Sequence, residues 1–169
     1  HSGSLDSART LNELAMRTYE EAGHTPGLLL AGNNLGSVLL KKGDAQGALR
    51  EFQRCFQLAD SMGDKGHAAI ALSNMGSIHA ELGDRKAAMS EALRAMVLAQ
   101  EAQEVVPLRD ASDLLFQMYK ATGRFKEALE MKELTERLRD SLDSEENHRE
   151  VMRQGFRYDF EKMEAATKA

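Results

Sequence analysis

The chain repeats itself at an interval of forty residues. The segment NNLGSVLLKKGD, residues 33–44, returns as SNMGSIHAELGD at residues 73–84, with Asn, Gly, Ser, Gly and Asp at matching positions. Apolar residues within the copies recur at steps of three and four, which is the period of a helix. A single helical hairpin cannot bury its own apolar stripe, so the repetition predicts a stack in which each hairpin covers the next.

Turn signals divide each copy in two. Glycine followed by aspartate occurs every twenty residues, at 43–44, 63–64 and 83–84; Gly123-Arg124 continues the series after an interruption at Gln103-Glu104. Glycine accepts the left-handed conformation that ends a helix, and aspartate accepts hydrogen bonds from the free amides that begin the next one. The spacing predicts an all-α protein of eight helices, arranged as antiparallel pairs without strands.

Small residues occupy matching positions where helices must approach closely. We expect Gly36 and Gly76 on the packed faces of successive first helices, with Gly76 next to the preceding second helix. Alanine recurs at one position of the second helices, at residues 48, 88 and 128. These positions predict tight contacts between neighbouring helices rather than exposed surface.

This pattern resembles the tetratricopeptide repeat, in which Leu-Gly, a large residue, Gly, Ala, an aromatic residue and a small residue follow in order. The first copy has Leu35-Gly36, Leu39, Gly43, Ala48, Phe52 and Cys55; the second has Met75-Gly76, His79, Gly83, Ala88, Ala92 and Ala95. A third copy has Leu115-Phe116, Tyr119, Gly123 and Ala128. The period of forty is similar to that of a longer-helix subgroup found in kinesin light chains and bacterial signalling proteins. The resemblance implies a right-handed superhelix.

The resemblance covers residues 5–142. Residues 5–21 match a second helix, because Ala8 and Ala15 stand forty residues before Ala48 and Cys55, so the solenoid contains a partial repeat and three complete ones. Residues 1–4, HSGS, are typical of an expression-tag remnant. Residues 143–169 are expected to form a separate C-terminal helix that Ser144 caps.

Two interpretations of the C-terminal helix remain open. Its apolar residues lie along one side at Met152, Phe156, Phe160 and Met163. As a cap, this side would cover the end of the solenoid, and the chain would be monomeric. As a linker, it would pair two copies of the chain, and the segment is similar to those that follow such repeats in bacterial histidine kinases, nucleotide cyclases and regulators.

The remaining features exclude several classes of function. A net charge of −5 with interleaved acids and bases leaves no basic stripe for nucleic acid, and no apolar run is long enough to span a membrane. The histidines lack the spacing of a zinc site, and Cys55 occupies a small-residue core position. We therefore predict no catalytic residue, metal or cofactor. The compartment stays open: periplasmic for part of a membrane sensor, otherwise cytoplasmic.

The expected function is protein or peptide binding, in the sensory or regulatory region of a larger bacterial signalling protein. Alternatives are a free-standing adaptor and, less favoured, a helical-repeat enzyme; a parent protein could still carry a kinase or cyclase domain. Helical geometry places one set of side chains opposite the packed glycines, facing a concave groove. This set contains Leu30, Asn34, Ser37, Lys41, Ile70, Asn74, Ser77, Glu81, Asp110, Leu114 and Gln117.

Overall fold

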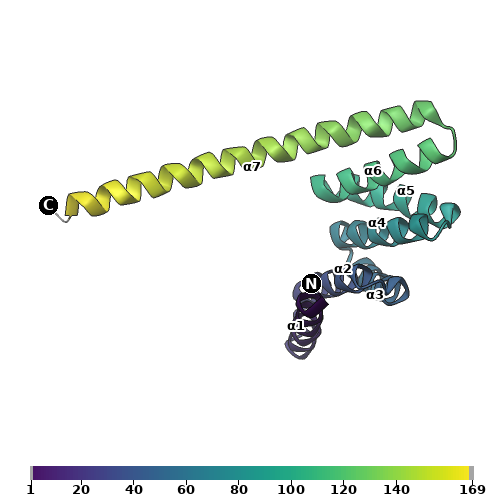
Figure 1. Ribbon diagram of the computed structural model, residues 1–169, viewed down its shortest axis with the longest axis horizontal. Helices are drawn as coiled ribbons and strands as arrows, with labels where there is room; N and C mark the ends of the chain where they lie inside the picture. The colour runs from purple at the N-terminus through teal and green to yellow at the C-terminus, as the bar shows by residue number, and fades with distance from the viewer. Residues whose placement is uncertain (1, 168–169) are drawn as a thin grey trace.

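Seven helices make up the described part of the protein, and they follow one another as a stack of antiparallel hairpins (Figure 1). The computed structural model describes residues 2–167; of residues 2, 147–148 and 150–167 it describes only the backbone. The helices are α1 (Ser2–Glu21), α2 (Thr25–Lys41), α3 (Ala45–Met62), α4 (Lys65–Glu81), α5 (Arg85–Ala102), α6 (Val105–Ala121) and α7 (Phe125–Thr167). The described residues contain no strand, and the predicted all-α superhelical repeat is confirmed.

The turns follow the predicted chemistry, including one that lacks glycine. Glycines 23, 43, 63, 83 and 123 all have positive φ. At the interruption in the series, Gln103 takes the same left-handed conformation with φ 55°, so the helix ends there without glycine. The side chains of aspartates 44, 64 and 84 each accept a bond from the amide three residues later. Before α2, His24 does the same through Nδ1, 3.0 Å from the Gly27 amide nitrogen.

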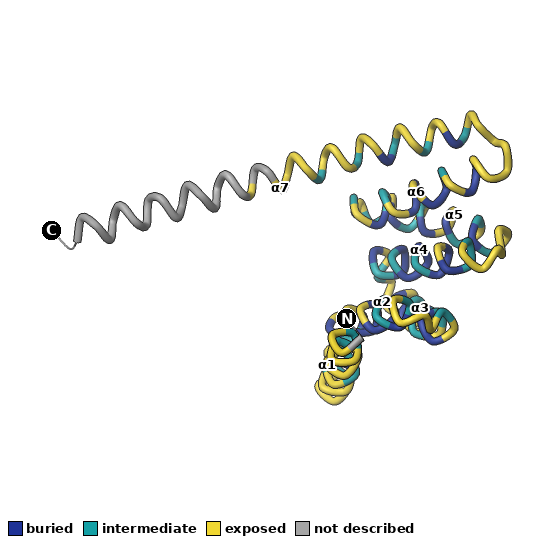
Figure 2. The backbone as a smooth tube through the Cα atoms, viewed as in Figure 1, coloured by how far each residue is buried: buried dark blue, intermediate teal, exposed yellow. Residues whose placement is uncertain are grey.

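The core runs through the stack along the facing sides of the helices (Figure 2). The alanines at 48, 88 and 128 are buried, as predicted. Gly36 lies against the ring of Phe52, since a methyl group at Gly36 would stand 2.6 Å from Phe52 Cε1. Phe52 is only 1% exposed. The absence of a side chain at Gly36 therefore makes room for the largest fully buried side chain of the core.

Gly76 is packed, as predicted, but against different neighbours. A methyl group at Gly76 would stand 2.8 Å from Leu114 Cδ2 on α6 and 3.4 Å from both the Ala88 carbonyl oxygen and Glu91 Cβ on α5. The expectation that Gly76 faces the preceding second helix was therefore wrong. The glycine instead faces the second helix of its own hairpin and the first helix of the next one.

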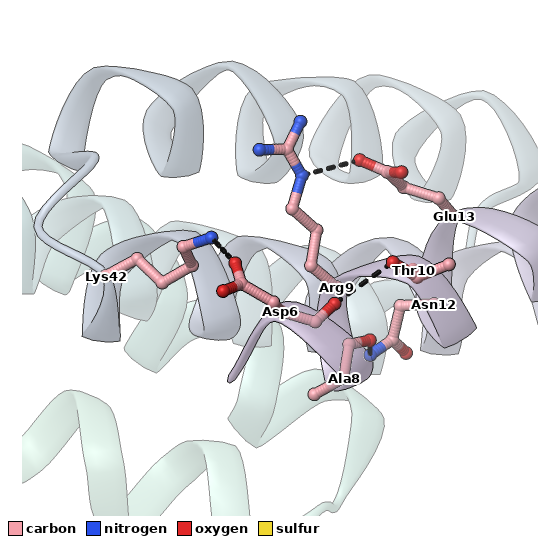
Figure 3. Close-up of polar contacts among 7 residues, drawn as sticks. All are labelled: Asp6, Ala8, Arg9, Thr10, Asn12, Glu13 and Lys42. Atoms are coloured by element: carbon pink, nitrogen blue, oxygen red, sulfur yellow. Dashed lines mark hydrogen bonds and ion pairs between the residues drawn. The ribbon is translucent and has the colours of Figure 1, made fainter. Parts of the chain in front are cut away.

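One ion pair joins α1 to the residue that follows α2, and two further polar contacts lie within α1 (Figure 3). Asp6 on α1 pairs with Lys42, which follows the end of α2, and this hydrogen bond holds the pKa of the Asp6 carboxyl below its ordinary value. Within α1, Arg9 pairs with Glu13 at 2.7 Å. The Asn12 side-chain amide donates to the Ala8 carbonyl at 2.8 Å. The two ion pairs are exposed and add little to stability.

The stack ends in a different way from the predicted one. Ser144 lies inside α7 rather than at the start of an eighth helix, so the prediction of eight helices was wrong. The second helices α3 and α5 receive the following first helix on a stripe of small or apolar residues: Phe52, Cys55 and Ala59, then Ala92, Ala95 and Ala99. In α7 the matching residues are Lys132, Thr135 and Arg139. Lys132 and Arg139 are long and charged, unlike the close-packed residues at the matching positions, and α7 continues as one helix past the stack (Figure 1).

Candidate ligand groove

A groove of about 410 Å³ opens between α4, α6 and α7. Two successive first helices, α4 and α6, pack against each other, and α7 packs along α6. Nine of the groove's twelve lining residues are polar or charged. The lining consists of Ser73, Asn74, Ser77, Ala80, Arg109, Asp110, Asp113, Leu114, Gln117, Met118, Thr135 and Arg139.

Five of the eleven sequence-predicted groove residues lie in this groove. They are Asn74 and Ser77 from α4 and Asp110, Leu114 and Gln117 from α6. Leu114 differs from the other four because it is only 8% exposed and touches Gly76. It therefore closes the floor of the groove, whereas the other four present polar groups to it.

The remaining six predicted residues lie outside this groove. Ile70 and Glu81 belong to α4 but do not line it, and Leu30, Asn34, Ser37 and Lys41 belong to α2, one repeat away. Leu30 is 56% exposed, and the Ser37 hydroxyl donates to the Asn33 carbonyl at 3.0 Å. The structure thus brings together five of the seven predicted residues on α4 and α6 and leaves those of α2 apart from them.

Sequence reasoning missed the part of the groove that α7 contributes. It considered first helices only, whereas Thr135 and Arg139 belong to a second helix. A signal was present, because these two residues break the small-residue pattern of Cys55-Ala59 and Ala95-Ala99. Ser73, Arg109 and Asp113 were also missed, since they lie one position before the predicted stripe on their helices.

Internal hydrogen bonds satisfy only some of the polar groups in the groove. The Ser77 hydroxyl donates to the Ser73 carbonyl at 3.0 Å, and the Thr135 hydroxyl donates to the Met131 carbonyl at 2.9 Å. Arg109 pairs with Asp110 at 2.6 Å. By contrast, the Ser73 hydroxyl is buried without a hydrogen-bond partner. A buried polar group of this kind costs free energy until a partner satisfies it.

Cys55 has none of the properties of a nucleophile. It is a free, buried thiol, and its nearest polar contact is weak, 3.9 Å from Sγ to the Leu29 carbonyl oxygen. Burial, reinforced by the Glu51 carboxylate, raises the pKa of the Cys55 thiol to about 11. Since the thiolate is the reactive form, this thiol is inert near neutral pH.

His79 serves packing and pairing rather than metal binding. Its Nδ1 lies 2.7 Å from Glu91 Oε2, and it lines a second cleft, of about 380 Å³, between α3 and α4. Across the part of the chain that the structure describes, no group of three or more His, Cys, Asp or Glu side chains is placed to hold a metal ion. None of the helices within residues 2–167 combines the length and apolar character needed to cross a bilayer.

The antiparallel pairs, the forty-residue register and the groove between successive first helices define the chain as a helical-repeat solenoid. Residues 27–101 match the family model of the tetratricopeptide repeat. These residues form tetratricopeptide repeats, as the sequence pattern predicted. Repeats of this family indicate a protein-interaction module.

Solved structures show the same fold. BtubC (BKLC) from P. vanneervenii is 21% identical with a TM-score of 0.69, and aspartyl phosphate phosphatase F from Bacillus subtilis is 20% identical with a TM-score of 0.69. A Podosopora anserina putative kinesin light chain with nearly identical TPR-like repeats is 13% identical with a TM-score of 0.53. Each comparison covers 83% of this chain and, respectively, 59%, 36% and 90% of the other. No curated protein matches the sequence.

The chain thus spans about three fifths and about one third of the first two structures. At these identities the similarity establishes the fold alone.

Proposed function

We propose that the protein binds an extended peptide segment of a partner protein in the groove between α4, α6 and α7. One observation carries this proposal: Asn74 and Ser77 on one first helix and Asp110 and Gln117 on the next line a single groove. Ser77 and Gln117 occupy the same position of successive repeats, and Asn74 and Asp110 lie about one and two helical turns before them on the same helices, so the groove presents several hydrogen-bonding groups from two neighbouring helices. An extended peptide backbone offers donors and acceptors along its length.

The chemistry of the groove favours a peptide backbone over a small apolar ligand. Asn74 and Gln117 each carry an amide that can donate and accept, and neither forms a hydrogen bond with another described residue. Leu114 and Met118 form the apolar floor of the groove. Amides can therefore hold the main chain while the floor receives an apolar side chain.

We further propose that the chain is the sensory or regulatory region of a larger signalling protein. Support comes from α7, which continues through residue 167 and so extends beyond the hairpin it forms with α6. A helix that leaves the stack suits a linker to another domain. The free-standing adaptor remains the alternative, and the natural full-length sequence after residue 169 would distinguish them. A membrane span followed by a kinase or cyclase domain there would support the sensor, whereas a natural terminus would support the adaptor.

Dimerisation through the C-terminal helix belongs to the same proposal. The residues predicted to form its contact face, Met152, Phe156, Phe160 and Met163, lie outside the residues whose side chains the structure describes. The helical-repeat enzyme is the least supported alternative, because Cys55 is buried with a raised pKa. The absence of catalysis in this chain stays a prediction.

A selection of random 12-residue peptides displayed on phage would test the groove. Ser77→Trp places a large ring in the groove, while Ser90→Trp adds the same ring at an exposed position of α5 outside it. We expect peptides selected on the wild type to lose binding to the first variant and to retain it on the second. Retained binding to a folded Ser77→Trp variant would move the binding site elsewhere.

A further inference from the structure

Two opposite charges line the groove without neutralising each other. Asp113 projects from α6 and Arg139 from α7, and neither forms an ion pair or hydrogen bond with any residue of the described part. The other two charges of the groove, Arg109 and Asp110, pair with each other at 2.6 Å. The groove is therefore neutral as a whole, yet it keeps one anion and one cation available.

The free cation sits where the repeat normally has a small residue. Arg139 is the counterpart of Ala59 and Ala99, both of which are completely buried beneath the following first helix. Within residues 2–167 no further first helix packs on α7, and the Arg139 side chain is exposed and lines the groove. An arginine in place of a buried alanine gives the last hairpin a charge that the two earlier ones lack.

The free anion lies in register with two buried polar residues. Asn33, Ser73 and Asp113 occupy the same position of three successive first helices. The Asn33 Oδ1 and Ser73 Oγ atoms are both buried without a hydrogen-bond partner. Ser73 is only 6% exposed and its hydroxyl is covered, whereas Asp113 at the same position of the next repeat is exposed and presents an unpaired carboxylate to the groove.

We propose that the groove selects a peptide of mixed charge, with an acidic side chain on Arg139 and a basic side chain on Asp113. This rests on the proposed peptide-binding function and specifies its ligand. A purely acidic segment would meet Asp110 and Asp113, and a purely basic one would meet Arg109 and Arg139. Like charges brought together in this way are penalised, so only a segment with both signs satisfies the groove.

Charge exchange tests the proposal on the same peptide library. Selections would be run on the wild type, Arg139→Glu, Asp113→Lys and the double variant. The matched controls are Arg137→Glu and Asp140→Lys, which alter exposed charges of α7 outside the groove. We expect wild-type peptides to contain one acidic and one basic residue at a fixed spacing. The double variant should select the same spacing with the two signs exchanged.

Affinities of individual peptides would show which contact each charge makes. Arg139→Glu should weaken the binding of a peptide selected on the wild type by about tenfold. The control substitutions should weaken the binding of the same peptide by less than about twofold. Replacing the acidic residue of the peptide with its amide should lower the affinity for the wild type by a similar factor. The same replacement should change the affinity for the Arg139→Glu variant little.

A peptide depends on the groove if it loses binding to the Ser77→Trp variant. If such peptides show no preference for paired charges, the mixed-charge ligand is overturned and the proposed function still stands. Failure to select any peptide that depends on the groove would instead overturn both. Circular dichroism of each variant would establish that the fold is retained.

Discussion

His79 Nδ1 lies 2.7 Å from Glu91 Oε2, and the equivalent glutamate one repeat earlier has no such partner. The His79 and Glu91 side chains are 23% and 12% exposed, so the contact is largely shielded from water. Forty residues earlier Leu39 stands in place of the histidine, and the Oε2 atom of Glu51 is buried without a hydrogen bond. One glutamate position thus occurs in a satisfied and an unsatisfied form within the same chain.

This contrast predicts opposite effects for one substitution. Glu91→Met should lower the free energy of unfolding by about 1 to 2 kcal/mol, because His79 loses its partner. Glu51→Met should leave stability unchanged or raise it, because it removes an unsatisfied buried oxygen. Urea denaturation of both variants measures the difference. In a His79→Leu background, Glu91→Met should cost much less; an undiminished cost there would show that the pair does not contribute the difference.

The two packed glycines should respond differently to alanine. Gly36→Ala places a methyl group against the fully buried Phe52 ring at a cost of about 1 to 3 kcal/mol, from which the better helix propensity of alanine subtracts about 1 kcal/mol. Gly76→Ala meets the terminal methyl of Leu114, which can rotate away, and alanine favours the helix by about 1 kcal/mol, so its net cost should be near zero. Thermal melts of the two variants provide the comparison. Equal losses would mean that the Phe52 ring moves as freely as the Leu114 methyl group.

The raised pKa of the Cys55 thiol predicts a loss of stability at alkaline pH. Folding raises the pKa of its thiol to about 11, so the folded state favours the neutral thiol. The resulting contribution to stability is fully present below the unfolded pKa of about 8.5 and is lost as the pH rises toward the folded value. Denaturation of the wild type and Cys55→Ala between these pH values isolates the effect, which the variant should lack. Iodoacetamide should modify the native thiol slowly at pH 8 and the unfolded one quickly.

Asn74 and Asn34 should differ in their effect on ligand affinity. Asn74 lines the groove and Asn34 does not. Asn74→Ala should weaken a groove-binding peptide by about 1 to 3 kcal/mol if it leaves a buried peptide group unsatisfied, whereas Asn34→Ala should have no effect. Calorimetric titration with a selected peptide measures both. A larger loss for Asn34→Ala would place the ligand on α2 instead.

Oligomeric state tests the linker interpretation of the C-terminal helix. If Met152, Phe156, Phe160 and Met163 pair two chains, residues 1–169 should sediment as a dimer, and a chain ending at Ser144 should be monomeric. The truncated chain retains all of the groove, so its unchanged peptide affinity serves as a control for folding. A monomer before truncation would reject dimerisation under those conditions.

The repeat architecture could be predicted because local signals and packing agree. Gly43-Asp44 and Gly83-Asp84 mark turns, and buried alanines such as Ala48 and Ala88 mark contacts, at the same interval. The turn at Gln103 was harder to predict, since a non-glycine residue takes positive φ there. The missing turn at Ser144 depends on whether another helix can pack on α7, and a capping residue alone does not determine that.

The groove could be predicted only in part because curvature decides which repeats share it. Helical geometry grouped Asn74 with Ser77 and Asp110 with Gln117, and these four residues line one groove. It could not show that α2 stands apart from this groove, because the spacing between first helices depends on side-chain packing. It also could not place Arg139 there, since that requires the path of α7 across the end of the stack.

The uninterrupted course of α7 gives the groove a mechanical connection to the far end of the chain. Thr135 and Arg139 lie on the same helix as Thr167. At 1.5 Å per residue, Thr167 is about 42 Å from Arg139 along the axis. A tilt of about 5° at the groove would therefore displace the far end by about 4 Å, which is about two thirds of the rise of one helical turn. One end of α7 is part of the groove wall, so when the helix tilts as a rigid body, a small shift at that wall becomes a larger displacement at Thr167.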